Sequence, residues 1–230
     1  MPAPLSIIIP AKDAAADLTG CLSALFPGVE AGLVREVIVS SVASNNTEMR
    51  EIANDAGATW IEGQEGRGTQ MKAGAELARG DWLLFVHADT WLSIDWPDVV
   101  GAHLHSKPEK AGAFQLQFRS GVRRARIVEA LTNWRARTFG LPYGDQGLLI
   151  SRKLYDEVGG FAQVPLMEDV MIVRKIGKAR IVELPARAAT SGQKQERDGW
   201  FGRSLRNLWL LFRFSRGATP EQLAKAYYGK

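Results

Sequence analysis

The chain has 230 residues, which is enough for one domain or two small ones. Hydrophobic residues make up 46% and charged residues 23%, the balance of a packed globular protein, and this excludes a disordered chain. The single cysteine, Cys21, cannot form an internal disulfide, so we expect a reducing compartment. The chain has three histidines and this one cysteine, which cannot build a structural zinc site of the usual kind. The net charge of +4 is too small to indicate nucleic acid as a partner.

The N-terminus lacks the basic start and the long apolar core of a signal peptide. No uncharged apolar run approaches the roughly 20 residues that a membrane-spanning helix needs. We therefore expect a soluble, cytoplasmic protein.

The first half of the chain alternates short β-branched runs with helical patterns. We expect strands at Leu5–Pro10, Glu36–Ser40, Thr59–Glu62 and Trp82–Val86, and helices at Asp17–Phe26 (ended near Pro27), Asn46–Ala56 and Arg67–Ala78. This alternation predicts an α/β fold, with a mostly parallel sheet and helices on both faces.

The second half is less regular. We expect strands at Phe114–Phe118, Gly147–Ile150 and Arg180–Leu184, and helices at Arg123–Thr138, Arg152–Val158, Val170–Ile176, Trp200–Phe214 and Pro220–Tyr228. The alternation in Phe114–Phe118 indicates a strand of a mixed sheet.

One carboxylate follows a buried strand at the edge where ligands bind in open α/β sheets. Asp89 lies in the segment His87-Ala88-Asp89-Thr90, directly after the fourth predicted strand. Mg²⁺ prefers one or two carboxylates together with substrate phosphates, so Asp89 is a candidate metal ligand. The alternative is that Asp89 only caps a turn.

Gly66-Arg67-Gly68 opens a predicted helix, where free N–H groups favour a phosphate. Met71 stands where a dinucleotide fingerprint needs its last glycine, and the chain has no GxxxxGK[ST] segment. A Rossmann dehydrogenase and a P-loop enzyme are therefore excluded, and an ordinary glycine turn is the alternative.

Glu168-Asp169 follows a proline-containing loop and opens another helix. Carboxylates at a helix start are stabilised by the helix dipole alone. The functional alternative is a general base beside a sugar-phosphate site.

These motifs occur in a specific order over nearly the whole chain. They are Ile7-Ile8-Ile9-Pro10, Gly66-Arg67-Gly68, Ala73-Gly74-Ala75, Ala78-Arg79-Gly80-Asp81, Leu84-Phe85-Val86-His87-Ala88-Asp89-Thr90, Gly147-Leu148-Leu149-Ile150-Ser151-Arg152, Val158-Gly159-Gly160-Phe161 and Glu168-Asp169. The order resembles family 2 of the glycosyltransferases, which have the GT-A fold. The HADT form of the family's DxD element resembles a subgroup of short soluble bacterial members.

The resemblance implies a site for a nucleoside-diphosphate sugar. The first nucleotide-binding loop would comprise Pro10, Ala11, Lys12 and Asp13, with further donor contacts from Ser41, Gly66, Arg67, Gly68 and Lys72. Asp89 matches the last aspartate of the DxD element, which binds a divalent cation, Mg²⁺ or Mn²⁺, and the diphosphate. His87 stands at the first position of that element, where it shapes the loop or acts as a second, weaker ligand.

The resemblance also implies the catalytic residues. Asp169 matches the base that deprotonates the acceptor hydroxyl, and Glu168 would orient the acceptor or the base. Asp145 and Gln146 would lie on the acceptor side. The implied reaction is one inverting displacement at the anomeric carbon, in a single domain over 1–230. Its nucleotide-binding half would span 1–95, its acceptor half 96–198 and its C-terminal helices 199–230.

The chain departs from the family pattern at three positions. Within Ser40-Ser41-Val42-Ala43-Ser44, Ser41 aligns with an aspartate that contacts the nucleotide, and serine carries no charge. Lys72 replaces an asparagine, and Ala14 replaces an acid. Two other functions therefore stay open: a nucleotidyltransferase, disfavoured because no glycine follows the first strand, and a non-catalytic nucleotide-sugar-binding protein.

The last long helix is basic and apolar. Residues 197–216 contain five arginines and one aspartate. A helical projection puts Phe201, Leu205, Leu208 and Phe212 on one face, predicted to pack on the core, and points Leu210 and Phe214 towards the arginines. This pattern predicts a helix sandwiched in a homodimer, or a helix lying at the inner face of the plasma membrane, near a lipid-linked acceptor. The arginines of 123–137 are a second basic surface, suited to an anionic membrane or a phosphorylated acceptor.

Overall fold

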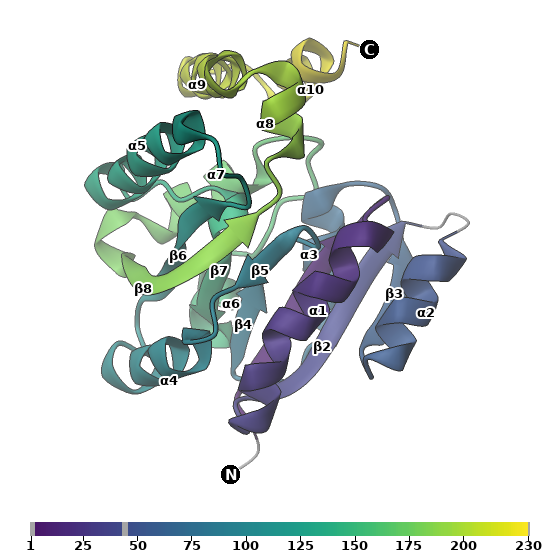
Figure 1. The fold of residues 1–230 in the computed structure, drawn as a ribbon. Helices are drawn as coiled ribbons and strands as arrows, with labels where there is room; N and C mark the ends of the chain where they lie inside the picture. The colour runs from purple at the N-terminus through teal and green to yellow at the C-terminus, as the bar shows by residue number, and fades with distance from the viewer. Residues whose placement is uncertain (1–2, 43–45, 230) are drawn as a thin grey trace.

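The computed structural model describes residues 3–42 and 46–229. Within these ranges the strands form one eight-stranded sheet in the order β3-β2-β1-β4-β7-β6-β8-β5 (Figure 1). The strands are β1 (Leu5–Ala11), β2 (Val34–Val42), β3 (Thr59–Gly63), β4 (Trp82–Phe85), β5 (Thr90–Leu92), β6 (Ala111–Phe118), β7 (Leu148–Ser151) and β8 (Ile181–Thr190).

The sheet is mixed but mostly parallel. β1 pairs in parallel with β2 and β4, and β3 continues in parallel beyond β2. β7 is antiparallel to β4 and β6, and β8 is parallel to β6 but antiparallel to β5. This arrangement confirms the predicted fold class.

Helices cover both faces of the sheet (Figure 1). The helices of the described residues are α1 (Ala15–Glu30), α2 (Thr47–Asp55), α3 (Arg67–Leu77), α4 (Trp96–Ser106), α5 (Arg123–Phe139), α6 (Arg152–Glu157), α7 (Glu168–Ile176), α8 (Gln193–Asp198), α9 (Trp200–Ser215) and α10 (Pro220–Tyr228). Of these, α8, α9 and α10 lie at one end of the molecule (Figure 1). Alternate residues of β1 divide the core: Ile7 and Ile9 pack with α1, α2 and α4, whereas Ile8 packs with α3, α6 and α7. Successive side chains of a strand point to opposite faces, so one buried strand supports two apolar layers.

Two predicted boundaries were wrong in the regions that tertiary packing decides. α1 continues through Pro27 to Glu30, where Gly28 packs against the fully buried ring of Trp96. β8 runs to Thr190 instead of ending at Leu184. Pro185 interrupts the apolar pattern there, at a register irregularity between β8 and β6. β5, α4 and α8 were not predicted.

The predicted core face of α9 was also wrong. Phe201, Leu205, Leu208 and Phe212 are 46–65% exposed, whereas Trp200 and Leu210 are buried. Trp200 packs edge-on against Phe118, and Leu210 packs with residues of α7 and α10. The helix therefore presents its larger apolar stripe to solvent.

The carboxyl ends of β1 and β2 are tied to α3 by a buried amide. The side chain of Gln70 donates to the carbonyl oxygens of Ala11 (2.9 Å) and Ser40 (2.7 Å), and it is 5% exposed. These two hydrogen bonds fix the ends of both strands at the edge of the sheet where the loops of the candidate site meet.

We predict that Gln70→Leu lowers the free energy of unfolding by about 1–3 kcal/mol, because two buried carbonyls lose a donor. Urea denaturation measures the change. Gln64→Leu, at an exposed position before α3, is the control and should change stability little. A Gln70→Leu protein as stable as the control would show that the amide does not hold these strand ends.

Candidate active site

Four segments that lie far apart in the sequence meet beside the carboxyl end of β4. They are the loop after β4 with His87 and Asp89, the short 3-10 helix η1 (Gly144–Gln146), the start of α7 and the start of α3. Of the residues predicted from the sequence, the structure brings Arg67, His87, Asp145, Glu168 and Asp169 into this cluster. Gly144, in the segment Gly144-Asp145-Gln146-Gly147, lies at its centre, between His87 and Asp169.

Both oxygens of the Asp169 carboxylate accept hydrogen bonds from backbone N–H groups. Oδ2 accepts from Gly144 at 3.0 Å, and Oδ1 accepts from Val170 at 2.7 Å. These bonds orient the carboxylate, and each oxygen keeps a second lone pair. Asp169 is half-buried, so a substrate hydroxyl can reach it.

His87 joins the loop after β4 to η1. Its Nδ1 lies 3.2 Å from Oδ1 of Asp145. An ionised carboxylate only accepts hydrogen bonds, so a hydrogen on Nδ1 lets the ring donate to Asp145. The Nε2 atom is buried and has no hydrogen-bond partner among the described residues. A buried polar atom without a partner is common where a ligand completes the site.

Gly144 allows these groups to approach one another. A Cβ at this position would lie 2.8 Å from the ring of His87 and 3.6 Å from the carboxylate of Asp169. Any side chain would push the imidazole away or break the backbone bond to Asp169. The close spacing of the acid and the imidazole therefore depends on glycine here.

Glu168 is almost fully enclosed, with 4% exposure. Burial raises the pKa of its carboxyl, the charge of Asp169 raises that pKa further, and Arg67 opposes the shift. The guanidinium of Arg67 lies 3.6 Å from the Glu168 carboxylate. Gly68 lets the start of α3 come this near, because a Cβ there would collide with the carbonyl of Ala162 and touch Glu168.

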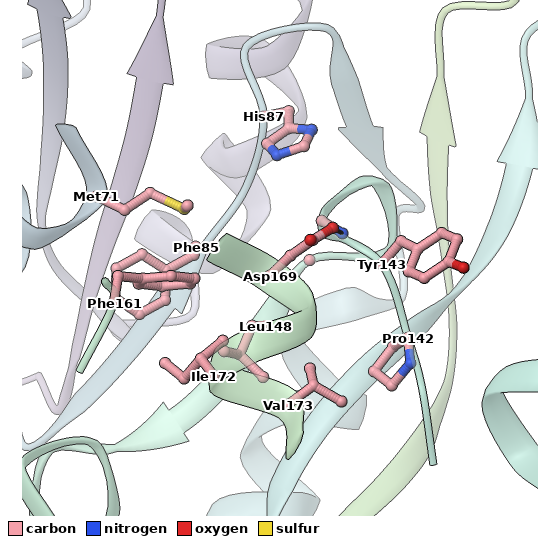
Figure 2. Close-up of a pocket in the computed structure, with 12 residues that line it drawn as sticks. Met71, Phe85, His87, Pro142, Tyr143, Leu148, Phe161, Asp169, Ile172 and Val173 are labelled. Atoms are coloured by element: carbon pink, nitrogen blue, oxygen red, sulfur yellow. Dashed lines mark hydrogen bonds between the residues drawn. The ribbon is translucent and has the colours of Figure 1, made fainter. Parts of the chain in front are cut away.

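A small pocket of about 20 Å³ opens beneath this cluster (Figure 2). His87 and Asp169 lie at its polar end, whereas Met71, Phe85 and Phe161 form one apolar wall. A space of this size holds about one water molecule. The pocket therefore brings two polar side chains and an apolar wall together at one point of the cluster.

Asp89 follows His87 by two residues in the same loop and lies apart from the pair that His87 forms with Asp145. It is half-buried, and its Oδ1 is 3.5 Å from the hydroxyls of both Thr90 and Thr190. Thr190 ends β8, so the unpredicted length of that strand brings it here. Across residues 3–42 and 46–229, no cluster of three or more histidine, cysteine or acidic side chains is arranged to hold a metal ion.

The predicted donor-binding residues lie along the neighbouring strand ends. Pro10 and Ala11 end β1 and are buried, Lys12 pairs with Glu65, and Asp13 has a positive φ of 50°. Ser41 is fully buried, and its hydroxyl accepts a hydrogen bond from the Asn46 side chain at 3.1 Å. Ala43 and Ser44, which follow it, lie outside the described residues.

Three further predicted residues have different surroundings. Lys72 lies half-buried on α3. Gln146 is 1% exposed, and its amide donates to the carbonyl of Phe114 and to the side chain of Asn133. In the structure Gln146 thus fixes η1 against β6 and α5. Gly66, with φ of 133°, forms the turn that leads into α3.

Sequence reasoning missed two aromatic groups near the site. The guanidinium of Arg135 stacks 3.4 Å from the ring centre of Tyr143, beside η1, and burial lowers the pKa of Arg135 and raises that of Tyr143. Tyr228, at the end of α10, lies near enough to Arg67 and Glu168 for their charges to act on its phenol. Neither stands in a recognisable motif, because tertiary packing alone brings them here.

A family model described as glycosyl transferase family 2 matches residues 6–162. No curated protein matches the sequence. The family model covers β1 through β7 and reaches the glycine pair before Phe161, so it includes the loop after β4 and η1.

Solved structures share the fold. A structure of glucosyl-3-phosphoglycerate synthase from Mycobacterium tuberculosis with Mn²⁺, UDP-glucose and phosphoglyceric acid has a TM-score of 0.61 and 20% identity, covering 81% of this chain and 71% of that one. S. aureus TarS with UDP-GlcNAc gives 0.60 and 16%, covering 82% and 58%. A second TarS structure, residues 1–349, gives 0.59 and 17%, and this chain spans 60% of its length. These likenesses confirm the GT-A fold.

We predict that Glu168→Gln raises the melting temperature near pH 7. The pKa of Glu168 is raised in the folded state, so its contribution to stability is present at low pH and is lost as the pH rises through that raised value. Glutamine carries no charge to bury, so it avoids this loss of stability. Because Arg67 is half exposed, losing its ion pair with Glu168 costs little stability. Thermal denaturation from pH 7 down towards 4.5, the ordinary value for glutamate, should show the gap narrowing.

Glu48→Gln, at an exposed position on α2, is the control and should behave like the wild type at every pH. If Glu168→Gln melts at or below the wild-type temperature at pH 7, the buried carboxylate is not a source of instability.

Proposed function

The chain belongs to glycosyl transferase family 2, and we propose that it moves a sugar from a nucleoside-diphosphate sugar to a hydroxyl acceptor, with inversion at the anomeric carbon. The observation that carries this proposal is the Asp169 carboxylate. It is oriented by two backbone N–H groups and lies open to solvent beside the carboxyl end of β4. The UDP-sugars in the TarS and glucosyl-3-phosphoglycerate synthase structures support the class of donor.

Asp169 acts as the general base in this proposal. The acceptor hydroxyl gives its proton to a free lone pair of the carboxylate as the acceptor oxygen forms its bond to the anomeric carbon. The bond from that carbon to the diphosphate oxygen breaks, and the nucleoside diphosphate leaves with the electron pair. The bonds from Gly144 and Val170 hold the base in place, which reduces the entropy cost of the step.

Asp89 fits a divalent cation shared with the substrate. Among residues 3–42 and 46–229, its carboxylate makes two long contacts with hydroxyls, both at 3.5 Å, so it keeps lone pairs for a ligand. Mg²⁺ takes one or two carboxylates with substrate phosphates, so a site with one carboxylate is sufficient. Mn²⁺ and Mg²⁺ accompany UDP in structures of glucosyl-3-phosphoglycerate synthase. When bound, such a cation stabilises the negative charge of the departing diphosphate.

Glu168 and Arg67 have a positioning role. The buried carboxylate holds the Arg67 guanidinium at the start of α3, and Gly66 forms the turn before it, where the N–H groups of a helix start favour a phosphate. Donor contacts from the first loop, from Ser41 and from Lys72 belong to the same half, 1–95. Asp145 and Gln146 belong to the acceptor half, 96–198.

Replacing the base should separate donor binding from turnover. We predict that Asp169→Asn keeps near-normal affinity for UDP with Mn²⁺ but releases glucose from UDP-glucose at least about 10²-fold more slowly, the lower limit for loss of a general base. Calorimetry measures the affinity, and a sugar-release assay measures turnover. Glu168→Gln should have the smaller effect, because it does not touch the acceptor.

The assay also tests the competing functions. Release of pyrophosphate would indicate a nucleotidyltransferase, and binding without any release would indicate a nucleotide-sugar-binding protein. If Glu168→Gln is inactive while Asp169→Asn turns over normally, Glu168 is the base and the assignment of the pair is reversed.

A second substitution tests the cation. Asp89→Asn removes the charge at the end of β4 and should abolish most of the Mn²⁺-dependent stabilisation by UDP in a thermal shift assay, with the melting temperature of the free protein unchanged. Asp95→Asn, at the start of α4, is the matched control. Equal Mn²⁺-dependent shifts in the Asp89→Asn protein and the wild type would place the cation elsewhere.

A further inference from the structure

Two neighbouring helices at one end of the molecule expose large apolar side chains. α5 and α9 are in contact, and both lie at the end that also carries α8 and α10 (Figure 1). On α9 the exposed side chains are Phe201, Leu205, Leu208, Trp209 and Phe212, and on α5 they are Ile127, Leu131, Trp134 and Phe139. We call these nine residues the apolar end surface. Clustered exposed groups of this size mark interaction sites, because monomeric proteins seldom leave them in water.

The exposed stripe of α9 is regular. Phe201, Leu205, Leu208 and Phe212 recur at helical spacing and are each 46–65% exposed. The opposite side of the helix already has partners, since Trp200 packs against β6 and α5, and Leu210 packs against α7 and α10. α9 therefore has two apolar faces: one packs against the protein, and the other is exposed to solvent.

Positive charge surrounds this surface. Residues 123–139 and 200–216 contain nine arginines and one acidic residue, Glu129. Glu129 is buried and already bonded to Arg126 and to the N–H of Phe118. The guanidinium of Arg213 lies 4.9 Å from the ring centre of Trp209, and that of Arg216 lies 5.6 Å from the ring centre of Phe212. Arginine thus borders the apolar stripe directly.

The exposed apolar side chains and the neighbouring arginines together indicate which partner can dock on this surface. A second copy of the chain docking through the same surface would bring arginines against arginines, with no exposed acid on either helix to pair with them. A neutral apolar partner would offer no counter-charge to Arg213 and Arg216, which border the stripe. An anionic lipid bilayer supplies both components, since acyl chains accept aromatic and leucine side chains and phosphate headgroups pair with arginine.

We infer that the apolar end surface is a docking site for an anionic membrane, with α9 lying in the interface. None of the helices in the described part of the chain has the length and apolar character needed to cross a bilayer, so the contact is a peripheral one. Docking would hold the site close to the lipid surface. Leu210 on the inner side of α9 packs with Met167 and Val170, which flank the Glu168-Asp169 pair, so the docked helix is in contact with the start of α7.

Vesicle binding by the full chain tests the inference. The wild type should sediment with phosphatidylcholine vesicles that contain phosphatidylglycerol, bind those of phosphatidylcholine alone at least about tenfold more weakly, and dissociate as the NaCl concentration rises. Leu205→Gln/Phe212→Gln and Arg213→Gln/Arg216→Gln should each reduce the partition coefficient at least about tenfold. Leu205, Phe212 and Arg216 are exposed and Arg213 is half-buried, so melting temperatures should stay close to the wild-type value.

Matched controls lie on other surfaces. Leu77→Gln/Ile94→Gln removes two equally exposed apolar side chains, and Arg35→Gln/Arg50→Gln removes two exposed arginines. Both should bind vesicles within about twofold of the wild type. Equal binding to neutral vesicles, or unchanged binding by the α9 variants, would overturn the inference. So would a dimer in analytical ultracentrifugation that Leu205→Gln/Phe212→Gln dissociates without any vesicle binding.

Discussion

The bond from the Gly144 N–H to Asp169 is the constraint on which the rest of the site depends. It joins η1 to the start of α7, two segments that are separate in the sequence. Once η1 is fixed there, Asp145 reaches His87 and thereby the loop after β4. The side-chain amide of Gln146 donates to the carbonyl oxygen of Phe114 and so fixes the same turn to β6. One backbone hydrogen bond thus brings the carboxylate, the imidazole and the sheet edge into one arrangement, and glycine is required because no Cβ fits.

The arrangement costs stability. Glu168 is enclosed next to a second carboxylate, and the half-exposed Arg67 offsets only part of this cost. Functional sites commonly retain such unfavourable groups because the surrounding core stabilises them. Here the two apolar layers on either side of β1, together with the Gln70 bond between strand ends, supply that support.

The sequence was informative where local chemistry decides the structure. The buried apolar runs predicted β1, β2 and β4. The roles of Asp89, which follows a strand, and of the Glu168-Asp169 pair, which opens a helix, stay predictions. The sequence was uninformative where long-range packing decides. Gly144 matters only because two distant loops meet there, and Pro185 concealed the end of β8. A helical projection of α9 identified which residues share a face, but with two apolar faces it could not tell which one turns inwards.

The most direct test of the proposed function is a crystal structure of the protein with UDP-glucose and Mn²⁺. We predict the diphosphate beside Asp89 and the glucose between Asp89 and Asp169, with the Asp169 carboxylate facing the side of the anomeric carbon opposite the diphosphate. A nucleotide bound away from Asp89, or a carboxylate of Asp169 on the same side of the sugar as the diphosphate, would contradict it.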